Sequence, residues 1–592
     1  MTQHHGARAS AHSTERSRLL PDGSDASSGT LAEEDQGASR SSSHGITPIR
    51  ASLIVVALGL LIFLQATNIS MLTTTQSTIA ADLDAFEKAS WFTSAYLVSM
   101  SSVAPITGRL SHIFSPRNVI FVSTIIFCIG CILTAFAPNF TGFMVGRSVS
   151  GIGAAGVFTV STILVLQLAP TKQRGLSVGL LNSGFTVGVS VGAIVAGALL
   201  ERTGWRALFW MQAPLGFVAA LCLLINIPET LSSDKPKTNH TSMISKLAHV
   251  DYVGAALLTG SIVFLLVGLS APKIVVLPVV ISLILLPIFI LNESYVAIDP
   301  IVPVTVLKSR GTLFTCLATV GLMMARWAVL FYSPVYVLSV RGWTPATAGT
   351  ILIPTNAGFA AGGILSGWIH IRRDGSFYFA TLVIFTLFPI SLVALMFAIT
   401  ANSSIVFLVI TLIVNGLCVG ASLVYSLAHV LHLTLPETHF IVTALLGTFR
   451  GFAGSFGSAI GGGIFARSLD ASLRDNFKER GLDGRAELIR RLIGSPALVS
   501  SLYGQEREVA IQGYVDAIRA LFLAGIVLGI AMICVQAATG WKGPSAQGNE
   551  EDRPFWTSES SADGVFEEGV EGVVQEAGHP GGLTVPGGGF DR

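Results

Sequence analysis

The sequence is poor in charged residues. Asp, Glu, Lys and Arg make up only 12% of the 592 residues, whereas soluble domains carry about 25%. The formal net charge of +1 gives no indication of a nucleic-acid partner. The low charge therefore excludes a string of ordinary soluble domains, although the length alone would allow several.

Cysteine is also scarce, and all six cysteines lie in apolar segments. Cys128 and Cys131 form a C-x-x-C, which is either a redox or metal pair or two small residues on one face of a helix. Their apolar neighbours favour packing. No nucleotide-binding glycine loop and no convincing catalytic constellation is present, so we expect neither ATP drive nor an enzyme. We expect no cofactor and no metal.

Long apolar runs dominate what is present. The mean hydropathy is +0.66, and runs of about 20 residues recur, each long enough to cross a hydrocarbon core roughly 30 Å thick. The sequence predicts an all-α integral membrane protein with about fourteen spans. The predicted spans are 51–73, 90–110, 118–137, 141–168, 175–199, 207–227, 252–270, 274–292, 313–338, 347–370, 377–399, 404–428, 440–466 and 515–538.

The connecting segments predict an orientation. The first apolar run is too long for a signal peptide, and the polar tails, 1–49 and 541–592, are expected to be disordered. Short loops on one side carry more Lys and Arg than those on the other, which places both tails in the cytosol. Residues 467–514 then form a long non-cytosolic loop, which we interpret as an amphipathic cap on the surface.

One glycine-rich stretch, "GLLNSGFTVGVSVGAIVAGALL" (179–200), contains no charge. Glycine weakens a helix in water, but in lipid it allows a neighbouring helix to approach closely. Gly184, Gly188 and Gly192 are spaced by four and share one face. We interpret this face as one that packs against a moving neighbour.

Two short turns resemble each other. "GRLSHIFSPR" (108–117) follows the second predicted span, and "GWIHIRRDGS" (367–376) follows the tenth. Equivalent turns in two halves of a membrane protein indicate an internally repeated transporter.

Over residues 50–540 the chain resembles the fourteen-span transporters of the major facilitator superfamily, the branch of fungal drug:proton antiporters and vacuolar basic amino acid transporters. The stretch at 179–200 resembles the antiporter motif of the fifth span. Its matching glycines are Gly179, Gly188, Gly192 and Gly197. The turn at 108–117 resembles the gating loop motif: Gly108 and Arg117 match, His112 replaces an acid and Ser115 a glycine. "GRSVSGIGAAG" resembles the fourth-span motif and includes Arg147.

The resemblance implies a major facilitator fold, with two six-helix bundles and an extra central helix pair. The implied segments are a tail (1–49), an N-terminal bundle (50–228), a cytosolic loop with the extra pair (229–293), a C-terminal bundle (294–540) and a second tail (541–592). It also implies a secondary transporter that moves a small organic solute out of the cytosol by proton antiport. A vacuolar basic amino acid transporter and a non-transporting solute sensor are the alternatives.

Charges inside predicted spans are functional candidates, because burying a charge in the bilayer is costly. Arg147, Arg326 and Arg450 lie away from the span ends, whereas no Asp or Glu does. Each arginine either faces a watery cavity or caps backbone carbonyls between helices. Because no buried carboxylate is offered, we expect a neutral or anionic solute rather than a cationic one.

Uncharged polar residues add further candidates. Gln65, Asn68 and Gln76 form a polar stripe on the first span, which either lines a cavity or bonds neighbouring helices. The resemblance implies an acid where Asn68 stands, so Asn68 and His112 bear on proton coupling rather than on the fold. His429 and His432 either carry a proton or lie at the headgroup level.

The N-terminal tail contains "ERSRLL" (15–20). Glu15, Leu19 and Leu20 fit the acidic dileucine pattern, which resembles sorting signals read by an adaptor for the vacuole or lysosome. This favours a vacuolar or other endomembrane over the plasma membrane, which remains the alternative. The expected partners are the solute, protons, the lipid bilayer and such an adaptor, and we expect a monomer.

Overall fold

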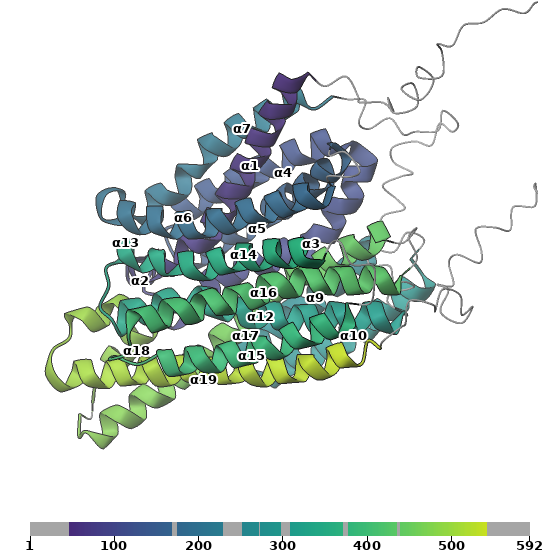
Figure 1. The fold of residues 1–592 in the computed structure, drawn as a ribbon. Helices are drawn as coiled ribbons and strands as arrows, with labels where there is room; N and C mark the ends of the chain where they lie inside the picture. The colour runs from purple at the N-terminus through teal and green to yellow at the C-terminus, as the bar shows by residue number, and fades with distance from the viewer. Residues whose placement is uncertain are drawn as a thin grey trace, which may run out of the picture. The chain divides into compact units, whose positions relative to one another are not determined.

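The computed structural model describes residues 47–168, 174–228, 251–271, 273–297, 308–370, 377–434, 439–482 and 484–540. These residues form helices and connecting turns, with no strand among them, so the prediction of an all-α protein is confirmed. The helices run lengthwise beside one another and are joined at their two ends (Figure 1). The proposed sorting signal at Glu15, Leu19 and Leu20 and the predicted tail 541–592 lie outside the described residues.

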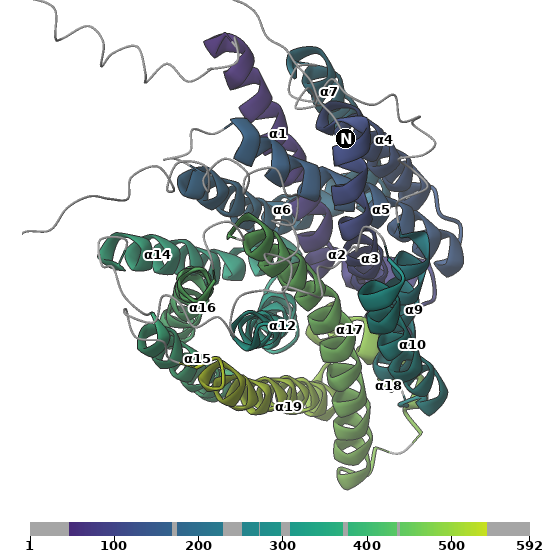
Figure 2. The same cartoon turned by 90° about the vertical axis from the view of Figure 1, so that its right-hand side faces the viewer.

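We call the first group of described helices the N-terminal half. It comprises α1 (Pro48–Ser70), α2 (Leu72–Asp82), the 3₁₀ turn η1 (Phe86–Lys88), α3 (Trp91–Phe114), α4 (Pro116–Ala135), α5 (Phe140–Leu168), α6 (Arg174–Trp210) and α7 (Gln212–Asn226). An extra pair follows, α9 (Tyr252–Ser270) and α10 (Val276–Tyr295). The pair packs together, and α9 also contacts α3 and α17 (Figure 2).

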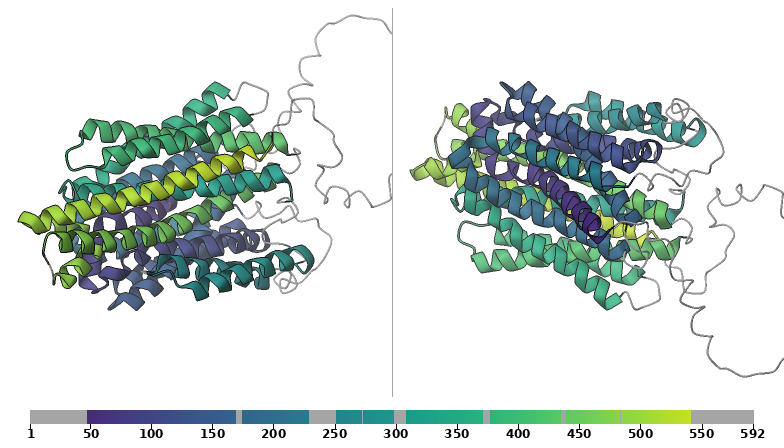
Figure 3. Two further views of the ribbon diagram at one scale, coloured as in Figure 1. Left: turned by 90° about the horizontal axis from the view of Figure 1, so that it is seen from below. Right: turned by 90° about the horizontal axis from the view of Figure 1, so that it is seen from above.

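The second group is the C-terminal half. It comprises α12 (Arg310–Ser339), α13 (Pro345–Ala348), η4 (Gly349–Ile351), α14 (Leu352–His370), α15 (Tyr378–Ala398), α16 (Ile405–Leu433), α17 (His439–Glu479), α18 (Ala486–Gly494), η6 (Pro496–Ser501) and α19 (Gly504–Ala537). Figure 3 shows the long α19 lying along its neighbours, and α19 packs on α12, α15 and α17.

Each of the fourteen predicted spans falls on a helix. Among the described residues, eleven helices are long and apolar enough to cross a membrane, and α7 is a shorter apolar helix. The first predicted span is divided at Met71, where α1 ends and α2 begins. Two of the predicted spans, 175–199 and 207–227, meet at a turn at Gly204, whose φ of 72° is one that glycine adopts without strain.

Close glycine packing holds helix pairs together within each half. A Cβ placed on Gly130 of α4 would lie 2.2 Å from the backbone nitrogen of Ser150 on α5. In the C-terminal half, a Cβ on Gly416 of α16 would lie 2.0 Å from the carbonyl oxygen of Thr355 on α14. No side chain fits at such distances, so these backbones approach as closely as small residues permit in a membrane.

The segment 467–514 differs from the expected surface loop. Within the described residues, α17 continues to Glu479 and α19 begins at Gly504, with α18 and η6 between them. Leu473, Phe477 and Val509 are buried in the core of the C-terminal half. The amphipathic pattern therefore correctly predicts helices in this segment. Their apolar face packs against neighbouring helices of this chain.

Candidate functional site

Arg147 lies inside the N-terminal half and is fully buried. Its Nε donates a hydrogen bond to the carbonyl oxygen of Phe92 at 2.9 Å, and its Nη1 donates to Oδ1 of Asn68. The guanidinium also lies over the ring of Tyr96, 4.5 Å from the ring centroid. All these partners belong to α1 and α3 of the same half. The geometry matches the capping alternative for this arginine.

The polar stripe of the first span also bonds neighbouring helices. Asn68 donates to Oε1 of Gln212 on α7 at 3.1 Å, and Gln65 points its amide nitrogen at the sulfur of Met100 on α3, 3.4 Å away. Both side chains are buried. Gln76 differs, because it lies on α2 and lines a small cavity between the halves.

The C-x-x-C follows the packing alternative. Cys128 donates to the carbonyl oxygen of Ala213 at 3.2 Å, and Cys131 accepts from Asn68 at 3.4 Å. Both thiols are free and buried. Within the described ranges, no group of three or more His, Cys, Asp or Glu side chains could hold a metal ion.

Arg326 begins a chain of hydrogen bonds that crosses between the halves. On α12, its Nη1 donates to Thr355 at 3.1 Å and its Nη2 to Oδ1 of Asn356 at 2.8 Å. Nδ2 of Asn356 in turn donates to the hydroxyl of Ser190 on α6, 2.7 Å away. The guanidinium also lies over the ring of Phe359, 4.7 Å from the ring centroid. A buried cation of the C-terminal half is thus connected to the N-terminal half.

Arg450 also reaches across. Its Nη2 on α17 donates to Oδ1 of Asn182 on α6 at 2.8 Å. Farther along α17, the hydroxyl of Ser455 bonds to the carbonyl oxygen of Leu97 on α3 at 2.7 Å. Sequence reasoning found both arginines but missed their partners, although Asn182 and Ser190 are visible as polar residues inside the fifth predicted span.

The glycines of α6 serve two different neighbours. A Cβ on Gly188 would lie 2.7 Å from the Cβ of Ala66, and a Cβ on Gly192 would lie 2.6 Å from the Cα of Thr67. Both neighbours belong to α1. A Cβ on Gly197 would lie 2.3 Å from the carbonyl oxygen of Pro345 in the C-terminal half. Gly188 and Gly192, on the face expected to meet a moving neighbour, therefore pack inside one half, whereas Gly197 packs against the other half.

Gly184 of this motif region has open space around it. Nothing lies within 4 Å of a Cβ placed on Gly184. Gly179 lies in the first turns of α6, and its surroundings lie outside the described part.

Partly buried aromatic rings lie near the same interface. Trp327 and Phe331 on α12 stack with ring centroids 5.3 Å apart, and Phe158 and Phe185 of the N-terminal half meet edge to face at 6.0 Å. Phe185 and Trp327 both pack against a buried cluster drawn from α1, α6, α12 and α14. The region between the halves thus offers aromatic surface beside the Arg326 chain.

One acid was placed at a span edge by the sequence and is buried in the structure. Among the residues that the structure describes, Glu293 is the single acidic residue with less than a tenth of its surface exposed, at 5%. It lies on α10, in the extra pair. His429 is likewise buried and is 3.0 Å from the hydroxyl of Thr539 on the C-terminal side of α19, whereas His432 is exposed.

The loop resembling the gating motif joins two helices. It spans the end of α3, with Gly108 and His112, and the start of α4, with Arg117; the side chain of His112 lies outside the described part. Ser115, which replaces the motif glycine, has a φ of 74°. Glycine adopts this angle freely and serine only with strain, so the residue that replaces the motif glycine has a backbone angle that glycine favours.

Comparison with protein families identifies the fold. The family model described as Major Facilitator Superfamily matches residues 58–458. The chain belongs to the major facilitator superfamily. It is a multi-pass integral membrane transporter, not an enzyme, and the predicted family is confirmed.

Relatives within the superfamily place the chain among fungal transporters. It is 26% identical over 540 residues to "Efflux pump notK" of Aspergillus sp. (strain MF297-2). The aligned region covers 88% of this chain and 93% of that protein. It is 27% identical over 331 residues to "Vacuolar membrane amino acid uptake transporter fnx2" of Schizosaccharomyces pombe, covering 54% of this chain and 56% of the relative.

A solved structure shows the same fold. The crystal structure of a bacterial homolog of the human lysosomal transporter Spinster aligns with a TM-score of 0.56 and covers 84% of this chain and 98% of its own. The sequence identity is 14%, so this similarity concerns the fold alone.

Proposed function

We propose that this transporter exports a small organic solute from the cytosol along a path between its two halves, past Arg326. The observation that carries the proposal is the chain from Arg326 through Asn356 to Ser190. A group that joins the halves at the interface is placed to respond both to a solute and to the rocking motion of such transporters. The similarity to the Aspergillus protein named as an efflux pump supports export.

We further propose a neutral or anionic solute. A cationic solute needs a carboxylate to offset its buried charge, and the acid buried in the described spans, Glu293, belongs to the extra helix pair. Arg326 and Arg450 supply positive charge at the interface, and Trp327 and Phe185 supply aromatic surface. These features favour a planar or apolar organic molecule that carries an acidic or uncharged polar group.

Proton antiport is the proposed coupling, supported by the resemblance of the fifth span to the antiporter motif. Asn68 cannot be the coupling group, because an amide does not titrate. Arg147 is its bonding partner and no carboxylate takes part in that contact. The coupling group therefore lies elsewhere in the chain.

The test uses the purified full-length protein in lipid vesicles with an imposed pH gradient. We expect labelled anionic or neutral aromatic solutes to move against the proton gradient, and Arg326→Gln to weaken their transport far more than it lowers expression. If lysine or arginine saturates the uptake and Arg326→Gln leaves it unchanged, the solute proposal is wrong. Solute binding without any flux would favour the sensor alternative.

A vacuolar basic amino acid transporter is the second candidate. The 331-residue similarity to the vacuolar amino acid transporter of Schizosaccharomyces pombe favours it. The same vesicle assay distinguishes the two candidates, because only this one predicts competition by lysine.

The cellular setting completes the proposal. We propose residence in the vacuolar or a related endomembrane, with an adaptor reading Glu15, Leu19 and Leu20, and a monomeric protein with both tails in the cytosol. Imaging should show the Leu19→Ala/Leu20→Ala variant at the cell surface. Reporter tags at Gly29 and Ser545 check the orientation, and a tag found on the non-cytosolic side contradicts it.

The proposed domains keep the boundaries 50–228, 229–293 and 294–540. The ends of α7 at Asn226 and the start of α12 at Arg310 support the proposal, although α10 runs past residue 293 to Tyr295. Separate expression of 294–540 and measurement of its helix content would test whether the second bundle folds on its own.

A further inference from the structure

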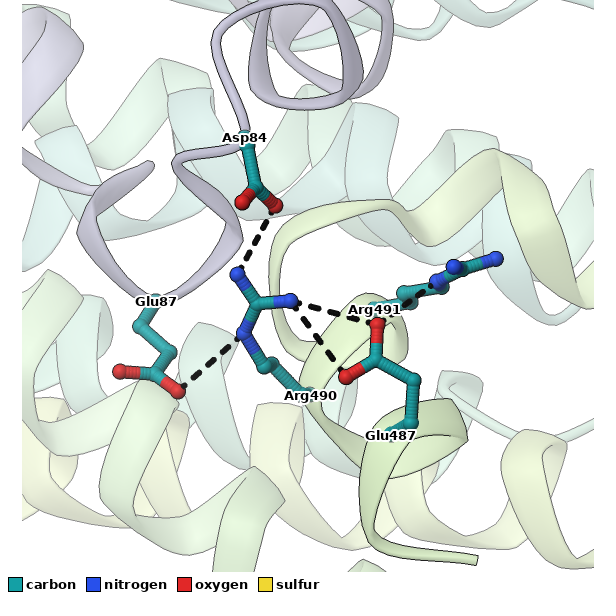
Figure 4. Close-up of polar contacts among 5 residues, drawn as sticks. All are labelled: Asp84, Glu87, Glu487, Arg490 and Arg491. Atoms are coloured by element: carbon teal, nitrogen blue, oxygen red, sulfur yellow. Dashed lines mark hydrogen bonds and ion pairs between the residues drawn. The ribbon is translucent and has the colours of Figure 1, made fainter.

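One arginine outside the transmembrane segments joins the two halves. Arg490 of α18 contacts three carboxylates (Figure 4): its Nη2 lies 2.8 Å from Oδ1 of Asp84 and its Nε 3.6 Å from Oε1 of Glu87. Its Nη1 lies 3.2 Å from Oε1 of Glu487 on its own helix. Asp84 and Glu87 follow α2 in the N-terminal half, so two of the three pairs cross between the halves.

A backbone contact lies beside these ion pairs. A Cβ placed on Gly494, the last residue of α18, would lie 2.4 Å from the Cα of Phe86 and 2.5 Å from its carbonyl oxygen. Only glycine leaves enough room for this approach. The ring of Phe86 also lies under the Arg490 guanidinium, 5.8 Å away. The ion pairs of Arg490 and the close backbone contact at Gly494 therefore both join α18 to the segment around η1.

The partner surface on the C-terminal half is firmly held. Ile489 and Leu492 of α18 are buried in the main core cluster of that half, together with Leu473 and Val509. The hydroxyl of Tyr514 on α19 also donates to the carbonyl oxygen of Leu492. The helix α18 thus moves with the C-terminal half and is not a free loop.

The space beside these contacts is small. A cavity of about 40 Å³ lies there, room for only a few water molecules at most. Its walls come from both halves and include Gln76, Glu87, Tyr332, Phe465 and Ile493. No organic solute passes through a space of this size, so the halves must separate here before a solute can leave by this end.

We propose that Asp84, Phe86, Glu87, Arg490 and Gly494 form a latch that closes one end of the transport path and opens once in each transport cycle. The inference rests on the proposed function, because only a protein that moves solute needs to open this end. The predicted topology makes it the non-cytosolic end.

The cation of the latch stays charged. The hydrogen bond and the negative charge of Asp84 raise the pKa of Arg490 above its usual value, so the guanidinium stays protonated on either side of a membrane. The latch is therefore released by movement of the halves rather than by loss of its cation.

Accessibility labelling of the full-length protein in lipid vesicles tests the latch without any solute. Gln76→Cys in the cavity wall serves as the reporter for a membrane-impermeant maleimide, with the protein lacking this change as background. Arg490→Gln is expected to raise the labelling rate roughly threefold to tenfold, because a network of several exposed pairs shifts a two-state balance by about this factor. Asp84→Asn should act in the same direction from the other half.

Arg491→Gln is the matched control. Arg491 is the next residue, equally an arginine, and pairs with Glu487 of its own helix, so its loss should leave the labelling rate unchanged. Arg490→Lys, which keeps the positive charge beside Asp84 and Glu87, should retain most of the slow labelling. If Arg490→Gln and Arg491→Gln label alike, the latch is refuted.

The labelling assay tests the latch, and the transport assay tests the proposed function. Fast labelling of Arg490→Gln together with no flux of any tested solute would leave the latch intact and contradict the proposed function. Solute flux together with an unchanged labelling rate of Arg490→Gln would support the proposed function and refute the latch. Gly494→Ala provides a variant without charge change, and it should label faster than Gly451→Ala, since nothing lies within 4 Å of a Cβ on Gly451.

Discussion

The two most buried arginines among the described residues make similar contacts but differ in where those contacts lead. Arg147 is fully buried and Arg326 is 5% exposed, and both lie beside an aromatic ring. The hydrogen bonds of Arg147 end on residues of its own half, Phe92 and Asn68. Those of Arg326 lead through Asn356 to Ser190 in the other half.

This difference separates structure from mechanism. Contacts within one half are kept when the halves rock against each other, whereas contacts between the halves must break and form again. We therefore expect Arg147 to act through stability and Arg326 through transport. The glycines of α6 divide in the same way, with Gly192 facing α1 and Gly197 facing Pro345.

The largest effect is expected for Arg147→Ala. The change removes the hydrogen bonds to Phe92 and Asn68 and the contacts with the Tyr96 and Phe209 rings. It also leaves a cavity, and the free energy of unfolding should fall by about 3–5 kcal/mol. Thermal unfolding of the purified protein in detergent measures it. Arg147→Lys should recover less than half of the loss, because an ammonium group cannot bridge both acceptors as a guanidinium does. If Arg147→Ala keeps normal stability but loses transport, Arg147 belongs to the transport site.

Gly192→Leu and Gly197→Leu sharpen the comparison. Gly192→Leu forces α1 and α6 apart and should cost about 1–3 kcal/mol of stability as well as transport. Gly197→Leu meets Pro345 across the interface and should reduce transport with little change in thermal stability. Gly184→Leu is the control, because a Cβ there has open space around it. Equal loss of stability in the Gly192 and Gly197 variants would contradict the division of this motif.

Arg326→Gln should lower transport roughly tenfold or more and lower the unfolding midpoint less than Arg147→Ala does, because Gln keeps an amide that can bond to Thr355 or Asn356. A hydrogen bond to a charged group contributes about 1.5–3 kcal/mol, and each 1.4 kcal/mol is worth a factor of about ten. Initial rates in vesicles, normalised to the amount of inserted protein, measure the change. If the variant loses stability and transport in proportion, Arg326 has the same structural role as Arg147.

The smallest effect is expected for Ser190→Ala. The change removes the last hydrogen bond between Asn356 and α6, a neutral bond of about 0.5–1.5 kcal/mol, so transport should change by roughly threefold in either direction. Thr186→Ala, one turn earlier on α6, is the matched control because its hydroxyl bonds to the carbonyl oxygen of Asn182 in its own helix. Identical behaviour of the two variants would remove Ser190 from the proposed chain.

Helix positions and family could be predicted from the sequence, whereas the partners of the site residues could not. Arg147 and Asn68 are 79 residues apart, and Asn356 and Ser190 are 166 residues apart. Apolar periodicity is a local property and reports which segment enters the membrane. Which polar groups meet depends on how distant helices pack, and a single sequence does not record that.

The segment 467–514 shows the same limit. Its alternating charged and apolar residues correctly indicate an amphipathic helix, but the pattern cannot tell whether the apolar face lies on lipid or on other helices of the chain. Packing of Leu473 and Phe477 into the C-terminal core decided this. As a result Arg490 lies against Asp84, an ion pair between residues 406 positions apart.

By itself, the sequence determined that this protein is an all-α membrane transporter, because long uncharged runs have no stable place in water and only helices satisfy the backbone in lipid. The tertiary structure alone decided which buried cation holds one half together and which connects the two. Hydrogen bonds require atoms within about 3 Å, and only the packing of helices far apart in the sequence brings Arg147 to Asn68, Asn356 to Ser190 and Arg490 to Asp84.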